Sequence, residues 1–450
     1  MMQFPKDFIW GSATSSYQIE GGWDADGKGS SIWDVFSHKK GNIENDETGD
    51  MACDHYHRYH EDIKLMKSIG IKAYRLSISW PRILPKGTGD INEVALAFYD
   101  NLIQELLKND ITPYITLYHW DLPQALQEKG GWEWEGISDA FAYYAGIVAE
   151  HFSDCVTFFA TLNEPQITLL LGYLEGTHAP GFKLPVKDAV KVMHYLLLAH
   201  GKAVKTMRKK AIQPIKIGAV TTGNLCYPST ETPTDISAAR QETFALSSDS
   251  WAFSHTWFWD AVIFGKYTHC SQFASLEDFS FVKKEDWDVI TQPLDFMGIN
   301  VYNGHEVCEK NGEPFYVPRI SGYPRTALGW PVTEQVMDFG LFFLYERYNL
   351  PIYITENGLA CNDKINLDGK VHDSDRIDFT RRYLLKMHQS IQRGTDIRGY
   401  FHWSLMDNFE WNSGYGPRFG LIYIDYPSQK RILKESAVWY KKVIESNSIS

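Results

Sequence analysis

The chain has 450 residues, of which 44% are hydrophobic and 22% charged, and its formal net charge is −12. This composition excludes a disordered or collagen-like chain, and the acidic balance argues against nucleic acid or an anionic membrane as a main partner. No apolar stretch reaches the ~18 residues of a membrane span, and the opening MMQFPKDFIW lacks the apolar core of a secretory leader. The six cysteines include no C-x-x-C pair, so we expect reduced thiols and a cytoplasmic protein.

Short runs rich in β-branched and aromatic residues alternate with segments of helical periodicity. The eight runs expected as strands are residues 8–14, 73–80, 112–120, 157–164, 216–223, 295–302, 351–356 and 397–405. No linker or low-complexity run divides the chain, so we predict one domain over residues 1–450. Eight β/α units predict an α/β fold, a single (β/α)8 TIM barrel. The alternative is a doubly wound open sheet, although the Gly-rich first turn typical of that fold is missing.

The intervening segments carry helical stripes and two possible helix starts. Apolar residues recur at helical spacing over residues 56–66 and 141–152. Ser138 is expected to cap the second of these helices, and Asp90 with Glu93 reads as a capping-box variant for another.

Carboxylates follow two of the predicted strands directly. Glu164 ends the run FFATLNEP and Glu356 the run PIYITENG, although glutamate suits a strand poorly and is costly to bury unpaired. Each could simply cap a helix or pair with an arginine. In a barrel, however, both would lie at the catalytic rim. A carboxylate pair there is what glycoside hydrolysis requires, because one group protonates the leaving oxygen while the other attacks or activates water.

Two other motifs resemble cofactor sites but fit them poorly. Residues 22–29 resemble a P-loop, yet glycine stands where Ser or Thr would bind magnesium. In the histidine-rich segment 55–61, only three of the candidate ligands could share one helix face. We therefore predict neither a nucleotide site nor a metal site.

Long motifs occur in order along nearly the whole chain. They are FIWGSATSSYQIEGG, YRLSISWPRI, HWDLPQAL, TLNEP, HAPG, GINVY, YITENGLA and HWSLMDNFEWNSGYGPRFGLIYID. Together they resemble family one of the glycoside hydrolases, the β-glucosidase family. The resemblance implies a (β/α)8 barrel with its active site at the C-terminal ends of the strands, retention of anomeric configuration and no cofactor.

The same resemblance implies roles for individual residues. Glu164 resembles the general acid/base and Glu356 the nucleophile. The residues that resemble the family's support for the nucleophile and the transition state are Arg75, Asn163, Asn300 and Tyr302. The expected sugar-binding residues are Gln18, His119, Trp120, Trp403, Glu410, Trp411 and Phe419, with Trp330 expected at the leaving group.

Glu410 bears on the substrate class. Relatives that cleave 6-phosphoglycosides replace this acid, and Pro417 stands where many members carry lysine, so a non-phosphorylated substrate is favoured. The sequence departs from the family's pattern at two positions: Gln166 stands where many relatives have tryptophan, and Val301 replaces a common aromatic residue. Both departures affect the expected leaving-group preference.

We therefore predict a retaining β-glucosidase that releases terminal, non-phosphorylated β-D-glucosyl units from short oligosaccharides or aryl and alkyl glycosides. Extension to β-galactosyl and β-fucosyl units is left open. The alternatives are a 6-phospho-β-glycosidase, a glycosyl-transferring enzyme and a non-catalytic sugar-binding barrel. The expected partner is a small β-glucoside or oligosaccharide, with no nucleic acid and no membrane, and the oligomeric state is left open.

Overall fold

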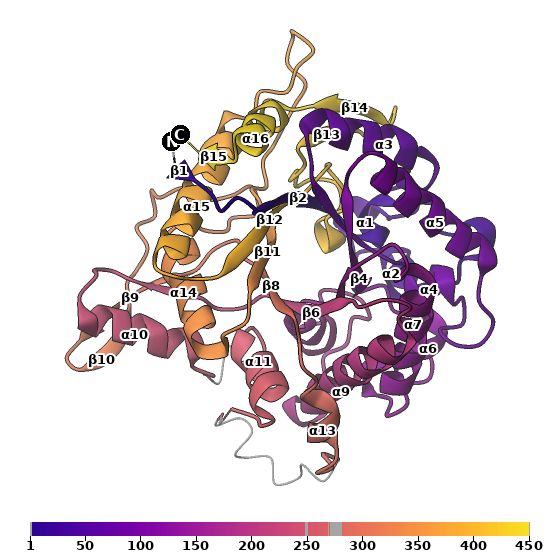
Figure 1. The fold of residues 1–450 in the computed structure, drawn as a ribbon, viewed down its shortest axis with the longest axis horizontal. Helices are drawn as coiled ribbons and strands as arrows, with labels where there is room; N and C mark the ends of the chain where they lie inside the picture. Colours follow the sequence, from indigo (N-terminus) through magenta and orange to yellow (C-terminus); the bar gives the residue numbers. More distant parts are fainter. Residues whose placement is uncertain (1, 248–250, 269, 271–280, 450) are drawn as a thin grey trace.

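Eight parallel strands form a closed barrel at the centre of the computed structural model, which describes residues 2–247, 251–268, 270 and 281–449 (Figure 1). Neighbours around the barrel follow chain order, and the last strand pairs with the first. The strands are β2 (Ile9–Ala13), β3 (Ala73–Ser77), β4 (Thr112–Tyr118), β5 (Phe158–Asn163), β6 (Lys216–Thr221), β8 (Phe296–Asn300), β11 (Ile352–Asn357) and β12 (Ile397–Trp403). Each predicted run overlaps one of them, so the barrel is confirmed and the open-sheet alternative is excluded.

Helices surround the barrel and connect its strands (Figure 1). Among the long helices, α7 packs against α9, α14 against α15 and α3 against α5. The helices are α1 (Ser16–Ile19), α2 (Ile32–Ser37), α3 (His55–Ile69), α4 (Trp80–Ile83), α5 (Glu93–Lys108), α6 (Gln124–Gln127), α7 (Ile137–Phe152), α8 (Pro165–Ile167), α9 (Val186–Lys210), α10 (Pro233–Phe244), α11 (His255–Phe264), α13 (Asp286–Ile290), α14 (Val336–Tyr348), α15 (Ser374–Gln392) and α16 (Glu435–Ser446). None of the described helices is both long and apolar enough to cross a membrane.

Both predicted helix starts were wrong in detail. Helix α7 begins at Ile137, so Ser138 lies within its first turn, where its hydroxyl accepts a hydrogen bond from Lys202 Nζ at 3.0 Å. Helix α5 is capped by Asn92, whose side chain accepts from the backbone N–H of Ala95. Asn92 directly precedes the first helical residue, the position from which a side chain best reaches the unpaired N–H groups of the first turn.

Aromatic side chains fill the barrel interior. The rings of Tyr114 and Phe158 stack with centroids 4.2 Å apart, and Phe401 meets Tyr114 at 4.9 Å. A Cβ atom added at Gly11 would lie 2.5 Å from Phe401 Cδ1, so this strand position has no room for a side chain. The interior is therefore a packed core, and space for a ligand is left at the C-terminal ends of the strands.

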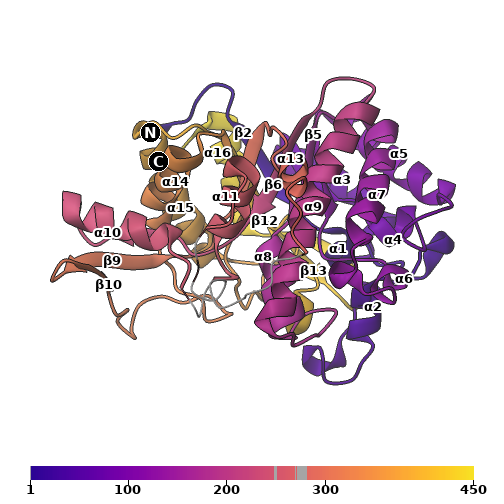
Figure 2. The same cartoon turned by 90° about the horizontal axis from the view of Figure 1, so that it is seen from below.

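Smaller sheets lie outside the barrel. β7 (Cys226–Pro228), β9 (His305–Lys310) and β10 (Glu313–Tyr316) form a ribbon that extends with α10 to one side of the barrel (Figure 2). β13 (Ile422–Asp425) pairs with β14 (Lys430–Leu433). β1 (Met2–Gln3) pairs with β15 (Ser448–Ile449), which brings the two ends of the chain together.

The P-loop-like segment and the histidine-rich segment make contacts within the protein. Lys28 Nζ lies 2.7 Å from the buried carboxylate of Asp34, and His55 Nδ1 lies 2.7 Å from that of Asp62. Within the described part of the chain, no group of three or more His, Cys, Asp or Glu side chains could hold a metal ion. All six cysteines fall within that part and are free thiols.

Candidate active site

The ends of the barrel strands bring the predicted site residues to one rim. Five lie on strands: Arg75 on β3, Asn163 at the end of β5, Asn300 at the end of β8, Glu356 on β11 and Trp403 at the end of β12. The others from this group, His119, Trp120, Glu164 and Tyr302, follow the ends of β4, β5 and β8 by one or two residues. Parallel strands of a barrel all end at the same rim, so residues far apart in sequence meet there.

Glu356 is buried and receives two strong hydrogen bonds. Arg75 Nη1 lies 2.6 Å from its Oε1, and the Tyr302 hydroxyl donates to its Oε2 at 2.8 Å. Arg75 is itself fixed, because its other nitrogens donate to Asn163 Oδ1 at 2.6 Å and to Thr116 Oγ1 at 3.1 Å. A cation and a phenol therefore hold this carboxylate in one orientation and favour its ionised form.

Glu164 has a different environment. Its Oε1 accepts a hydrogen bond from Asn300 Nδ2 at 2.7 Å, and Asn300 is oriented by Thr355, whose hydroxyl donates to Asn300 Oδ1 at 2.7 Å. No cationic side chain lies within ion-pair distance of Glu164 in the described residues. The backbone of Glu164 is left-handed, with φ of 46°, a conformation that costs free energy in a residue with a side chain and is concentrated at functional sites.

Burial and mutual repulsion separate the acidities of these groups. Burial, followed by the negative charge of Glu356, raises the pKa of Glu164 to about 8. Burial also raises the pKa of Glu356, but the Arg75 charge and the hydrogen bonds from Arg75 and Tyr302 oppose that rise. Because Arg75 and Tyr302 bind Glu356 and only an amide binds Glu164, a proton shared by the pair is favoured on Glu164. Burial and the Glu356 charge likewise raise the pKa of Glu410 to about 8.

A cavity of about 250 Å³ contains both carboxylates. Its described lining includes no lysine and no arginine. The lining residues are His119, Trp120, Glu164, Ile167, Leu171, His178, Tyr302, Leu328, Trp330, Glu356, Trp403, Glu410, Trp411, Asn412, Ser413 and Phe419. Flat aromatic walls with a few convergent polar groups suit a sugar ring.

A second cavity of about 370 Å³ adjoins the first and shares Glu164, Tyr302 and Trp330 with it. The two cavities also share Ile167 and Leu171, and the wall of the second is mostly apolar as a whole, with Leu170, Leu225, Phe253 and Val301 beside the polar Asn224, Asn303 and His305. Gln166, by contrast, lines neither cavity, because its side chain is buried and donates to the backbone carbonyl of Ser254. Of the two departures from the resemblance, Val301 therefore lines the second cavity, whereas Gln166 lines neither.

The aromatic residues that line the first cavity include two groups of neighbouring rings. Trp120, Trp411 and His119 form one aromatic wall, in which the two tryptophan rings are 4.5 Å apart and His119 stacks near Trp411 at 5.9 Å. In the second group, Trp330 lies 5.3 Å from the Tyr302 ring and 6.1 Å from that of Phe419, measured between centroids.

Two expected contact residues make protein contacts beside the cavity. Gln18 is buried behind Glu410 and donates through Nε2 to Asn408 Oδ1 at 3.0 Å and to Glu410 Oε2 at 3.4 Å. Asn163 Nδ2 lies 3.0 Å from His119 Nε2. Burial and the nearby Arg75 charge lower the pKa of His119 well below its usual range, so this ring is neutral and accepts the bond.

Sequence reasoning gave no role to several residues of the cavity. His178, from the motif HAPG, lines the cavity and meets Asn412 Oδ1 through Nε2 at 3.0 Å. That motif was the signal that could have identified it. Leu171 and Leu328 also line the cavity, and no pattern in the sequence distinguishes them from core leucines.

A family model for glycosyl hydrolase family 1 matches residues 1–449 of the chain. The chain belongs to glycosyl hydrolase family 1. This family 1 glycosidase is 44% identical, over 100% of both chains, to a 1,4-β-D-glucan glucohydrolase from Thermotoga neapolitana. It is 37% identical to an aryl-phospho-β-D-glucosidase from Bacillus subtilis, over 99% of this chain and 98% of that one. The solved structure of a Thermotoga maritima β-glucosidase in complex with glucoimidazole superposes with a TM-score of 0.90 at 43% identity and covers 100% of both chains.

Proposed function

We propose that this family 1 glycosidase is a retaining β-glucosidase that acts on terminal, non-phosphorylated β-D-glucosides. The observation that carries the proposal is a pair of buried carboxylates in one cavity that have different hydrogen-bond partners. Glu356 accepts from Arg75 and Tyr302, whereas Glu164 accepts from Asn300. The names of its similar relatives support glucosides as the substrate class. We further propose that residues 1–450 act as one domain and that the protein is cytoplasmic, in keeping with its free thiols.

In the first step, a Glu356 oxygen attacks the anomeric carbon while Glu164 transfers its proton to the glycosidic oxygen. The bond from that carbon to the glycosidic oxygen breaks, and the leaving group departs as an alcohol. Arg75 and Tyr302 keep Glu356 ionised and aimed. Asn163 is proposed to donate to the sugar 2-hydroxyl, a contact that strengthens in the transition state.

In the second step, the glucosyl ester of Glu356 is hydrolysed. Glu356 carries no charge while esterified, so the repulsion that raises the pKa of Glu164 is relieved. Glu164 is then a carboxylate and takes a proton from water as the water oxygen attacks the anomeric carbon. The ester bond breaks, and both carboxyl groups return to their starting states.

The aromatic cavity is proposed to bind the glucosyl unit. Trp403 forms the stacking floor, while His119, Trp411 and Glu410 accept from or donate to the 3-, 4- and 6-hydroxyls, with Gln18 behind Glu410. The second, mostly apolar cavity is proposed to take the leaving group, with Trp330 at the boundary between the two. Its walls favour aryl and alkyl leaving groups.

The phosphorylation state of the substrate can be tested directly. We expect 4-nitrophenyl β-D-glucoside to be hydrolysed, and its 6-phosphate to be cleaved at least ~100-fold more slowly, since the described lining of the cavity offers no lysine or arginine to pair with a buried phosphate. Initial rates at equal concentration measure this preference. Faster cleavage of the 6-phosphate would reverse the assignment, and no cleavage of either compound would favour a non-catalytic sugar-binding barrel.

A further inference from the structure

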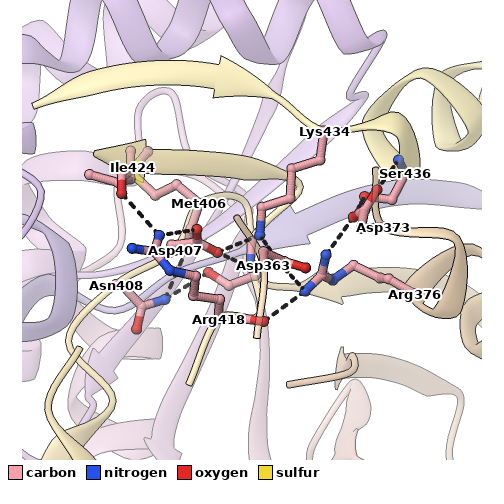
Figure 3. A network of polar contacts seen from close by, with 12 residues as sticks. Asp363, Asp373, Arg376, Met406, Asp407, Asn408, Arg418, Ile424, Lys434 and Ser436 are labelled. Atoms are coloured by element: carbon pink, nitrogen blue, oxygen red, sulfur yellow. Dashed lines mark hydrogen bonds and ion pairs between the residues drawn. The ribbon is translucent and has the colours of Figure 1, made fainter. Parts of the chain in front are cut away.

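Residues 403–420 supply part of the lining of the proposed sugar pocket. Asp407 and Arg418 of this segment belong to a group of buried charges, whose contacts Figure 3 shows. The segment carries Trp403, Glu410, Trp411 and Phe419 into the cavity. The group, here called the charge cluster, consists of Asp363, Asp373, Arg376, Asp407, Arg418 and Lys434. None of its members lines either cavity beside Glu164. The cluster therefore does not touch the sugar in the proposed mode of binding.

Lys434 and Asp407 form the centre of the charge cluster. The fully buried Lys434 Nζ lies 2.6 Å from Asp407 Oδ1 and 2.5 Å from Asp363 Oδ2. Asp407 is also held by Arg418 Nη1, 2.7 Å from its Oδ2, and by the Gly420 N–H, 2.9 Å from its Oδ1. Three donors thus converge on one carboxylate, two from residues 418–420 and one from Lys434.

The rest of the cluster ties this centre to the body of the barrel. Arg376 pairs with Asp363 at 2.7 Å and with Asp373, and it donates to the backbone carbonyl of Arg418 at 2.7 Å. Three acidic and three basic side chains balance in charge. Removing one partner would leave an uncompensated buried charge, which is far more costly than losing an exposed ion pair.

A short chain of hydrogen bonds connects Asp407 to Glu410. The next residue, Asn408, accepts from Gln18 Nε2 through Oδ1 at 3.0 Å and donates to Ser404 Oγ at 3.1 Å. Gln18 Nε2 also donates to the backbone carbonyl of Phe409, the residue before Glu410, at 3.0 Å and lies 3.4 Å from Glu410 Oε2. The backbone is equally confined, because a Cβ atom added at Gly420 would lie 2.1 Å from Asp407 N. Displacement of Asp407 would therefore shift the partners that set the position of Glu410.

We propose that Asp407 and Lys434 are positioning residues for recognition of the 6-hydroxyl end of the glucosyl unit. They act through Asn408 and Gln18 on Glu410, from a site that the substrate does not reach. The proposal rests on the β-glucosidase function proposed above.

The test compares two substrates in the variants Asp407→Asn and Lys434→Met. We expect kcat/KM for 4-nitrophenyl β-D-glucoside to fall ~10–100-fold, mainly through KM, the range for a buried polar group that loses its hydrogen bond. For 4-nitrophenyl 6-deoxy-β-D-glucoside, which lacks the 6-hydroxyl, we expect a loss several-fold smaller. The ratio of kcat/KM for the glucoside to kcat/KM for the 6-deoxyglucoside should therefore fall in both variants. A merely structural role would lower both kcat/KM values equally and leave this ratio unchanged.

Asp260→Asn is the matched control. Asp260 is a buried carboxylate on α11 that pairs with Arg347 at 2.6 Å and lines neither cavity. This variant should lose thermal stability but keep the wild-type substrate ratio. If Asp407→Asn does not fold, the double variant Asp407→Asn with Lys434→Met removes one charge of each sign, and the same fall in ratio is expected.

An unchanged ratio in folded variants of an active enzyme would overturn the positioning role, as would an equal change in the Asp260→Asn control. Failure of the proposed function would look different, because the wild-type protein itself would then not hydrolyse 4-nitrophenyl β-D-glucoside.

Discussion

Replacing Glu356 with glutamine is expected to lower kcat/KM for 4-nitrophenyl β-D-glucoside by roughly 10⁴–10⁶-fold, the range found when an enzyme loses its nucleophile. An amide cannot form the glycosyl ester, although its oxygen can still accept from Arg75 and so leaves no unpaired cation in the site. Steady-state rates, with thermal unfolding as the check on folding, measure this effect. A folded variant with a tenth of wild-type activity would remove the nucleophile role from Glu356.

Tyr302→Phe is the graded control for the same carboxylate. It removes one donor to Glu356 but keeps the ring beside Trp330, so we expect a smaller loss in kcat/KM of ~10–100-fold.

Added azide gives a second readout of the nucleophile's position in the variant Glu356→Ala, since azide entering the vacated space should yield α-glucosyl azide. A β-glucosyl azide from this variant would place the nucleophile elsewhere.

Glu164→Gln is expected to slow cellobiose hydrolysis by roughly 10²–10⁴-fold, the usual contribution of general acid catalysis. An amide cannot give a proton to the poor sugar leaving group. The loss should be much smaller for formation of the glucosyl enzyme from 2,4-dinitrophenyl β-D-glucoside, whose leaving group needs no proton. Full activity on cellobiose, or equal loss on both substrates in the pre-steady-state burst, would contradict this role.

The pH profile gives an independent check on Glu164. Its pKa is raised to about 8, and the protonated form is the active one, so kcat/KM should be retained at neutral pH and fall as the pH rises through about 8. Glu164→Gln should lose the part of this alkaline limb that Glu164 contributes, because glutamine does not titrate, whereas Glu410, whose pKa is also raised to about 8, is present in both proteins.

The barrel was predictable because its signals are local and repeated. Each strand is a short apolar run between helical stripes, and eight such runs tolerate errors at their ends. The helix caps failed for the opposite reason. The helices follow Gly136 and Asn92, whereas the predicted caps were Ser138 and Asp90, two residues away in each case. The exact start of a helix depends on the conformation of one backbone turn, which composition does not determine.

For the site, the sequence indicated the rim position of Glu164 and Glu356 but not their surroundings. The Asn300 bond to Glu164 and its support by Thr355 arise only when three strands close into the barrel. Likewise, nothing local to Asp407 predicts that Lys434, 27 residues later, shares its carboxylate. Contacts of this kind depend on tertiary packing, which periodicity does not encode.

The most direct test of the double-displacement account is the anomeric configuration of the first glucose released, followed by ¹H NMR during hydrolysis of 4-nitrophenyl β-D-glucoside. With Glu356 as nucleophile and Glu164 as acid and then base, the β anomer should form first and the α anomer only later, by mutarotation. Initial release of the α anomer would mean a single displacement by water, and the roles proposed for both carboxylates would be wrong.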